Sequence, residues 1–310
     1  QDRLSDQSQK PLLHTLEDRL QRAGILSSDG NPDRLRQPRR ALAHRSYTEE
    51  KPGTLSSLEL SPRVERAIRD RRRVWLRHTP DVVDEQRRKR GDDGSFRAWP
   101  LQLIFHNISW YLAFETVAIG RNDGLGLIRV LRLDRLVLTQ EDGNVRRSSE
   151  QEHAWALERL ERLMDVCGGV YFGESIEDQL AVMGPLLGRT VKPPYQVLRF
   201  SCTPGVFNLI RETPRRLPLE HIAFSSAIPG DGIKDPGTRC ILPPNPAGDS
   251  HPYPVEYRLP SWTVERDWDL RNWLFRWGAG IRIEQPTELR EKQLQEARAV
   301  MELYQPRQGH

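Results

Sequence analysis

The side chains of this sequence that could bind a ligand are arginines, histidines and one tyrosine. The decapeptide HNISWYLAFE, residues 106–115, contains a segment that alternates as a strand does. A period of two divides that segment between two faces, with Trp110, Leu112 and Phe114 on one and Tyr111, Ala113 and Glu115 on the other. We expect the first face to be core. Tyr111 then offers a phenol to a pocket, or is a cross-strand aromatic without a ligand.

A second segment carries arginines that could complete an anion site. IRVLRLDRL, residues 128–136, is predicted to be a strand in which Arg129 and Arg132 lie on opposite faces, so at least one leaves the core. A guanidinium beside an exposed phenol offers a fork for phosphate and a plane for stacking, as sites for single-stranded nucleic acid do. His106, in the predicted turn before Trp110, either lines this site or is a turn residue with no role.

A basic run between residues 63 and 90 predicts a surface for nucleic acid. Its positive side chains form two groups, the first with Arg69, Arg71, Arg72, Arg73 and Arg77, the second with Arg87, Arg88, Lys89 and Arg90. Such a cluster increases association with nucleic acid and makes it steeply salt-dependent. A solvated charged face is the alternative. The whole chain has a net charge of +4 and 41 arginines against 6 lysines, a bias that bidentate phosphate binding or a GC-rich genome would explain.

The sequence contains no enzyme signature, and we predict no catalysis, no metal and no cofactor. GLGLIR, residues 124–129, lacks the third glycine of a dinucleotide-binding loop and precedes a strand. The eight histidines lack the spacing of metal ligands, and neither GxSxG nor HExxH occurs. Helix capping explains Asp267 and Asp269 better than a metal pair does. A nuclease or other hydrolase has no supporting cluster.

Cysteine usage and hydropathy indicate the compartment. Cys167, Cys202 and Cys240 lie too far apart for a CxxC pair or a disulfide framework, which fits a reducing cytoplasm. No apolar run approaches the roughly 20 residues that a membrane crossing needs. We therefore expect a cytoplasmic protein without membrane association. The chain begins QDRLSDQ, without an initiator Met or a signal peptide, so we expect further residues upstream.

Hydrophobic periodicity predicts an α+β protein of four parts. Residues 1–60 contain an amphipathic helix over 11–26 and form either the remnant of a winged-helix unit or an irregular arm. Residues 61–140 combine a helix over 61–73, with Ser61 as its N-cap, and strands over 74–78, 96–105, 110–115 and 128–136 in a small antiparallel barrel or sheet. Residues 141–194 are a helical linker.

The fourth part, residues 195–310, has the element order β, α, β, β, α, β, α, which predicts a ferredoxin-like sandwich. It begins with a strand over 195–202. A helix over 267–277 is expected to stop at Gly278, before a strand over 280–284 and a final helix over 287–304. Residues 230–252 are expected to be a long insertion loop.

Two groups of motifs resemble the WYL domain family and its C-terminal extension. The first is WPLQLIFHNISWYLAFE followed by RVLRLDRL, with VERAIRDRRRVWLRH upstream, where His78 stands in place of a common Tyr. The second is DWDLRNWLFRWGAGIRIEQPTELREKQLQEA. Together they cover roughly residues 62–137 and 195–305.

The resemblance implies an Sm-like β-barrel in a ligand-sensing transcription regulator, with Tyr111, Arg129, Arg132 and Arg135 facing the ligand. His78, at the position of the common Tyr, and His106, in the turn beside Trp110, are the further ligand residues that we predict. The resemblance also implies a homodimer, a ligand such as single-stranded DNA or RNA or an oligonucleotide, and a role in phage defence or CRISPR systems. The alternative is a CRISPR-associated accessory subunit that binds RNA or an effector complex without binding a promoter.

Overall fold

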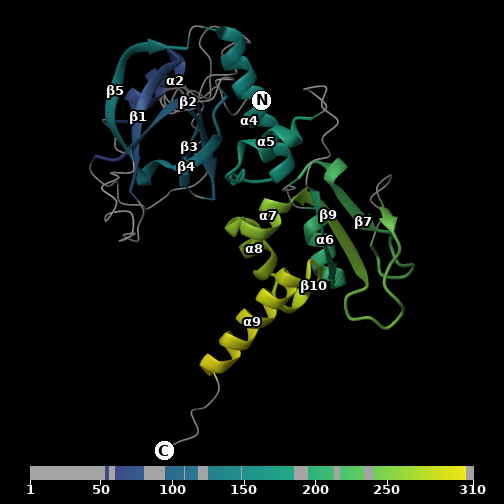
Figure 1. Cartoon of the computed structure of the whole chain (residues 1–310). Helices are drawn as coiled ribbons and strands as arrows, with labels where there is room; N and C mark the ends of the chain where they lie inside the picture. Colours follow the sequence, from purple (N-terminus) through teal and green to yellow (C-terminus); the bar gives the residue numbers. More distant parts are fainter. Residues whose placement is uncertain are drawn as a thin grey trace, which may run out of the picture. The chain divides into compact units, whose positions relative to one another are not determined.

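The structure is a computed structural model that describes residues 53–55, 60–79, 95–107, 109–117, 125–147, 149–184, 195–212, 217–233 and 240–304. The chain divides into two compact units, residues 1–160 and 161–310. Each unit is built around a mostly antiparallel sheet with helices packed on it, as Figure 1 shows. The predicted α+β class is therefore confirmed. The predicted helix over 11–26 and the rest of residues 1–52 lie outside the described residues.

The first unit contains one five-stranded sheet, which we call the first sheet. Its elements in chain order are helix α2 (Ser61–Arg69), β1 (Arg72–His78), β2 (Ser95–His106), β3 (Ser109–Thr116), β4 (Ile128–Arg132), a 3-10 turn η3 (Leu133–Arg135) and β5 (Leu136–Arg146). The strand order is β4-β3-β2-β1-β5, and every pair is antiparallel. No pairing between β4 and β5 closes this sheet into a barrel within the described residues.

Hydrophobic residues alternate with polar ones along the strands, so one face of the first sheet is apolar. This face packs against α2. Leu112 and Phe114 of β3 are fully buried there with Leu76 of β1, and Trp110 packs against the same cluster. This core face is the one predicted from HNISWYLAFE. The hairpin turn after β2 contains Asn107 with a φ of 43°, a left-handed conformation that Asn accepts more readily than most residues.

Three local predictions in the first unit are wrong. The single strand expected over 128–136 is two strands, because η3 turns the chain and sends β5 back along β1. The expected cap of α2 is also different, since Leu60 is its N-cap residue and makes no side-chain cap. Ser61, predicted as the cap, is the first helical residue, and its hydroxyl has no hydrogen-bond partner among the described residues. The helix ends at Arg69, before the predicted Arg73.

Helices α4 (Glu150–Cys167) and α5 (Ile176–Val182) follow the first sheet, in the region predicted to be a helical linker. Ser175 caps α5 by accepting a hydrogen bond from the Asp178 backbone N–H at 3.2 Å. No described helix has both the length and the apolar composition needed to cross a membrane.

The second unit contains the second sheet, with strand order β10-β6-β9-β7-β8. Its elements after α5 are β6 (Tyr195–Cys202), α6 (Pro204–Glu212), the 3-10 turn η4 (Leu219–His221), β7 (Ile222–Ser225), β8 (Cys240–Leu242), β9 (Tyr253–Pro260), α7 (Ser261–Arg266), α8 (Trp268–Phe275), the 3-10 turn η5 (Gly278–Gly280), β10 (Ile281–Gln285) and α9 (Thr287–Tyr304). The neighbouring strands are antiparallel except β7 and β8, which are parallel.

The core of the second unit is aromatic. Phe207 of α6 stacks on Tyr253 of β9 with ring centroids 4.5 Å apart, and Phe200 of β6 meets Tyr257 edge to face at 5.4 Å. Asp267 caps α8, since its carboxylate accepts from the backbone N–H of Asp269 at 2.9 Å. Capping, the role predicted for these aspartates, is thus confirmed for Asp267.

The second unit differs from its predicted elements at two places. The expected loop over 230–252 contains the short edge strand β8. The helix expected over 267–277 is α8, which ends at Phe275, and α7 precedes it. Gly278, predicted to end the helix, has a φ of 51° and opens η5. A left-handed residue there redirects the chain into β10.

Candidate nucleic-acid interface

The first sheet has a second face, opposite its core face, and strand register determines which residues share it. Antiparallel partners lie side by side on one face, so Trp75 lies beside Arg97 and Trp99 beside Glu115. Tyr111 lies on the same face beside Arg132. The second face therefore combines tryptophans, arginines and the predicted tyrosine.

Arginine and tryptophan side chains alternate at the β1–β2 end of the second face. The guanidinium carbon of Arg97 lies 4.6 Å from the centroid of the Trp75 ring. Those of Arg73 and Arg147 lie 5.7 Å and 5.2 Å from the Trp99 ring. Each distance is within the range of a cation–π contact. We call these five residues, Arg73, Trp75, Arg97, Trp99 and Arg147, the arginine–tryptophan ladder.

The ladder is accessible in part. Arg97 is exposed, while Trp75, Trp99 and Arg73 are half-buried. A half-buried tryptophan flanked by guanidinium groups presents an aromatic surface within a positively charged surround. Bases stack on such surfaces, and guanidinium groups bind phosphates.

A buried carboxylate anchors one end of the ladder. Glu115 is only 2% exposed, and one of its oxygens accepts from the Arg159 guanidinium at 2.9 Å and from the Gly126 backbone N–H at 3.0 Å. Its other oxygen accepts from Arg147. Arg159 is fully buried and also donates to the Gly126 carbonyl at 2.7 Å. Glu115 thereby fixes the guanidinium of Arg147 near the Trp99 ring, and two arginines share one carboxylate.

Gly126 is required by the close approach of the backbone to β3. A Cβ atom at this position would lie 1.6 Å from the Thr116 carbonyl oxygen. Only a residue without a side chain lets the Gly126 N–H reach Glu115 while the Thr116 N–H donates to the Leu127 carbonyl at 2.9 Å.

The positive charge near this cluster affects a histidine of α4. The pKa of His153 is lowered to about 4, mainly by burial and also by the charges of Arg147 and Arg71, against the opposing effects of Glu115 and Glu150. His153 is therefore neutral at physiological pH. The surroundings of the Glu115 cluster disfavour an additional cation.

The tyrosine predicted as a ligand residue lies at the far end of the second face. The Tyr111 ring meets the His106 ring edge to face, with centroids 6.0 Å apart, so the structure brings these two predicted residues together. Arg132 lies across from Tyr111 in register, but its guanidinium binds Asp134 through two hydrogen bonds of 3.0 Å and 2.6 Å. This bidentate pair directs Arg132 towards a local carboxylate.

The remaining predicted ligand residues lie elsewhere on the first sheet. Arg129 lies across from Phe114, on the opposite side of β4 from Arg132, and is exposed. Arg135 lies in η3, where its carbonyl accepts from the Thr79 backbone N–H at 2.8 Å, and His78 precedes Thr79 at the end of β1. The backbone thus brings His78 and Arg135 near each other, and η3 itself contacts β3.

The arginines of the basic run between residues 63 and 90 lie on different parts of the first unit. Arg73 and Arg77 lie on the second face, Arg69 is exposed at the end of α2, and Arg72 pairs with Asp70 at 3.0 Å. Arg71 has a φ of 54° in the turn between α2 and β1, and its carbonyl accepts from the Arg147 backbone N–H at 3.0 Å. The second group, Arg87, Arg88, Lys89 and Arg90, lies outside the described residues.

Sequence analysis did not identify four members of the ladder, Trp75, Arg97, Trp99 and Arg147. The signal was present in the alternation RVWLR in β1 and FRAW in β2, which puts Arg and Trp on the same side of each strand. Among the described residues, no group of three or more His, Cys, Asp or Glu side chains is arranged to hold a metal ion.

Comparisons with known proteins identify no family. No family model and no curated protein matches the chain. Proteasome accessory factor B/C (PafBC) of Arthrobacter aurescens is a similar solved structure, with 16% identity, a TM-score of 0.26, and coverage of 82% of this chain and 29% of that one. A CRISPR Cas-related protein has 12% identity, a TM-score of 0.37, and coverage of 78% and 51%. The chain thus spans about half or less of either structure.

Proposed function

We propose that the chain is a ligand-sensing regulator of the WYL type, whose first unit binds single-stranded nucleic acid or an oligonucleotide through the arginine–tryptophan ladder. The observation that carries this proposal is the alternation of guanidinium groups and indole rings on one face of the first sheet, with contacts of 4.6 to 5.7 Å. Bases would stack on Trp75 and Trp99 while the arginines contact the backbone phosphates.

The arrangement of these contacts favours a single-stranded nucleic acid over a mononucleotide as the ligand. Trp75 and Trp99 lie on adjacent strands, and each ring has a guanidinium against it. Two stacking surfaces with interleaved charge suit two successive bases of a flexible strand, since every base has a π-face and every linkage a phosphate. Tyr111 and His106 would contact a further part of the same ligand along the second face.

The finer assignments depend on the resemblance to the WYL family and on topology. In this proposal the first sheet is of the Sm-like type, and the order β10-β6-β9-β7 of the second sheet supports a ferredoxin-like C-terminal domain. Transcriptional regulation linked to phage defence or CRISPR systems, and a cytoplasmic location, are proposed on the resemblance and the sequence alone.

Binding of short single-stranded DNA and RNA oligomers to the full chain tests the proposal. Trp75→Ala and Trp99→Ala should each weaken binding by about 1–3 kcal/mol, the range found for stacking contacts, while Trp75→Phe should retain most of the affinity. Arg97→Gln should reduce the slope of log affinity against log salt by about one. Tyr111→Phe and Arg132→Gln show whether the ligand extends to the tyrosine end of the second face.

A matched control is Arg258→Gln in the second unit. Arg258 also lies over an aromatic ring, 5.3 Å from the centroid of Tyr195, but on the second sheet. Its loss should leave oligomer binding unchanged. If no oligomer binds at low salt, or if the ladder variants bind as the Arg258→Gln variant does, the proposed interface is wrong.

A further inference from the structure

The Glu115 end of the ladder contains two buried arginines for one buried carboxylate. Arg147 and Arg159 share the carboxylate of Glu115, and their side chains are only 7% and 0% exposed. Nη1 of Arg147 is buried and has no hydrogen-bond partner among the described residues. A buried N–H of a charged group without an acceptor is costly, and an anion that supplies an acceptor relieves that cost.

The charge of a third arginine acts at the same place. The backbone N–H of Arg147 donates to the carbonyl of Arg71 at 3.0 Å, so the end of β5 lies beside the start of β1. Burial is the main cause of the lowered pKa of His153 on α4, and the charges of Arg147 and Arg71 lower it further, while Glu115 and Glu150 oppose the shift. The two guanidinium charges therefore act on the same small region, and the surplus charge at this end of the ladder is positive.

The backbone of Arg71 has a conformation that arginine rarely adopts. Its φ of 54° is left-handed, and residues held in this region cluster at ligand and switch sites. The neighbouring Arg72 pairs with Asp70 at 3.0 Å, so the closest acidic residue in the sequence is already engaged.

The Trp99 ring is where an anion would meet these charges. The guanidinium carbons of Arg73 and Arg147 lie 5.7 Å and 5.2 Å from its centroid. The ring is half-buried, and Glu115, its partner in register on β3, is only 2% exposed. The accessible part of the second face therefore stops at Trp99 on this side, so a strand of nucleic acid that follows the ladder would end here.

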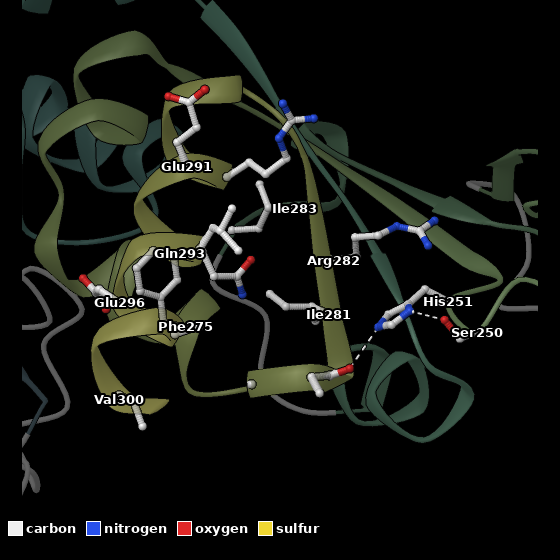
Figure 2. A pocket seen from close by; sticks show the side chains of 15 residues that line it. Ser250, His251, Phe275, Ile281, Arg282, Ile283, Glu291, Gln293, Glu296 and Val300 are labelled. Carbon is white, nitrogen blue, oxygen red and sulfur yellow. Dashed lines mark hydrogen bonds between the residues drawn. The ribbon is translucent and has the colours of Figure 1, made fainter. Parts of the chain in front are cut away.

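A groove beside β10 in the second unit shows the opposite arrangement around an arginine. Figure 2 shows Arg282 at this groove, pointing towards His251. Both carboxylate oxygens of Asp249 accept from the Arg282 guanidinium, at 2.9 Å and 2.7 Å. A carboxylate thus occupies the N–H fork of Arg282, whereas the fork of Arg147 keeps one donor that no described group satisfies.

We propose that the Glu115 end of the ladder is a terminal-phosphate site, which binds the phosphate monoester at one end of a nucleic-acid strand. The inference rests on the proposed function and deepens it, because it defines the ligand as an oligonucleotide with a terminal phosphate. The last base stacks on Trp99, and the phosphate lies beside the ring, where Arg71, Arg73 and Nη1 of Arg147 donate to it. A monoester carries a charge of about −1.5 to −2 at neutral pH, while a linkage within the strand carries about −1, so the monoester neutralises the surplus better.

Fluorescence anisotropy with the full chain tests the proposal on three single-stranded oligomers of one sequence, in DNA and in RNA. The first oligomer carries a 5′ phosphate, the second a 3′ phosphate, and the third a hydroxyl at both ends. One phosphorylated oligomer should bind at least about tenfold more tightly than the hydroxyl oligomer, because its phosphate gains charge-assisted hydrogen bonds. The other should bind like the hydroxyl oligomer. A gain of equal size at both ends would reflect added charge alone and would overturn the proposal.

Two variants locate the phosphate. Arg147→Gln and Arg71→Gln should each remove most of the preference for the phosphorylated oligomer and change the affinity for the hydroxyl oligomer little. Arg77→Gln is the matched control, since Arg77 lies on the second face at the other end of β1, opposite Ser95, and this variant should keep the preference. Thermal unfolding identifies a variant that fails to fold. Arg71 makes neither ion pair of Glu115, so its variant tests the site even if Arg147→Gln unfolds.

The outcomes separate the terminal-phosphate site from the proposed function. If the three oligomers bind equally and Trp75→Ala and Trp99→Ala weaken all of them, the ladder binds nucleic acid and the terminal-phosphate site is wrong. If Arg147→Gln and Arg71→Gln both keep the preference, the phosphate binds elsewhere and the site is wrong as well. If no oligomer binds at low salt, both proposals fail.

Discussion

On the second sheet, Arg199 lies between two carboxylates, 2.8 Å from Glu256 and 2.8 Å from Glu284, and the three side chains are about 70% buried. On the first sheet, Arg73 and Arg97 lie over tryptophan rings, and Arg147 both lies over Trp99 and binds the buried Glu115. A carboxylate occupies the N–H fork of a guanidinium and cancels its charge. A ring contact leaves the charge in place.

The comparison separates two uses of the same residue type. Arg199 of the second sheet bridges neighbouring strands and neutralises two acidic side chains, so its role is local. The guanidinium groups of Arg73 and Arg97 lie against the indole rings of the ladder. The contrast teaches that the arginines of the chain do not all have the same environment, since some guanidinium groups contact carboxylates and others contact rings.

The largest expected effect comes from removing the carboxylate that anchors the ladder. Glu115→Ala leaves the buried guanidinium groups of Arg147 and Arg159 without their shared anion, so the first unit should lose about 3–5 kcal/mol of stability. Urea unfolding of the full chain measures the loss. Glu256→Ala on the second sheet is the control. It removes one partner of Arg199, a carboxylate whose side chain is 28% exposed, while Glu284 remains, and should cost about 0–1 kcal/mol.

Equal losses of stability in Glu115→Ala and Glu256→Ala would contradict the distinction between the buried carboxylate of the first sheet and the partly exposed one of the second. They would mean that the Glu115 carboxylate stabilises the fold no more than a surface ion pair does. Trp99→Ala in the same assay distinguishes the anchor from the ladder, since this ring is half-buried and its removal leaves both ion pairs of Glu115 in place.

A smaller effect is expected from the backbone contact beside Glu115. Gly126→Ala places a Cβ atom against the Thr116 carbonyl, so the strands must shift and the first unit should lose about 1–3 kcal/mol. Gly205→Ala is the matched control in the second unit. No heavy atom lies within 4 Å of its added Cβ, and Gly205 is in helix α6, so the change should stabilise the protein by about 0.4–1 kcal/mol. Opposite signs in thermal unfolding are the expected result, and a tolerated Gly126→Ala would refute the close approach.

The sequence predicted local structure better than it predicted the site. Period-two alternation correctly assigned Leu112 and Phe114 to the core and Tyr111 to the other face. When one face of a strand is buried, every second residue is apolar, and this pattern can be read in the sequence. The break at η3 left only a weak mark, since Leu131 and Leu133 continue the alternation and only the polar pair Asp134–Arg135 interrupts it before Leu136. The register of β1 with β5, which depends on that turn, could therefore not be foreseen.

The ladder and its anchor depend on contacts between distant residues. Arg159 reaches Glu115 across 44 residues of sequence, and no pattern within either segment indicates the pair. Arg97 meets Trp75 only because β1 and β2 pair with Val74 opposite Ala98; a shift of one residue would turn Trp75 away from Arg97. Composition showed that arginines are abundant, whereas strand register decided which of them meet rings.

The smallest expected effect is a difference in pH dependence between two histidines. The pKa of His153 is lowered from 6.5 to about 4 by burial, with the charges of Arg147 and Arg71 adding to the effect. Below pH 6.5 the unfolded chain binds a proton that the folded one rejects, so the contribution of His153 to stability is complete above pH 6.5 and is lost as the pH falls towards 4.

Burial also lowers the pKa of His221 in the second unit, but the carboxylate of Glu220 opposes the shift. His153→Gln should therefore flatten the dependence of the urea midpoint on pH between about 4 and 6.5 more than His221→Gln does. If both variants keep the wild-type dependence, the pKa of His153 is not lowered as its burial and the charges of Arg147 and Arg71 require.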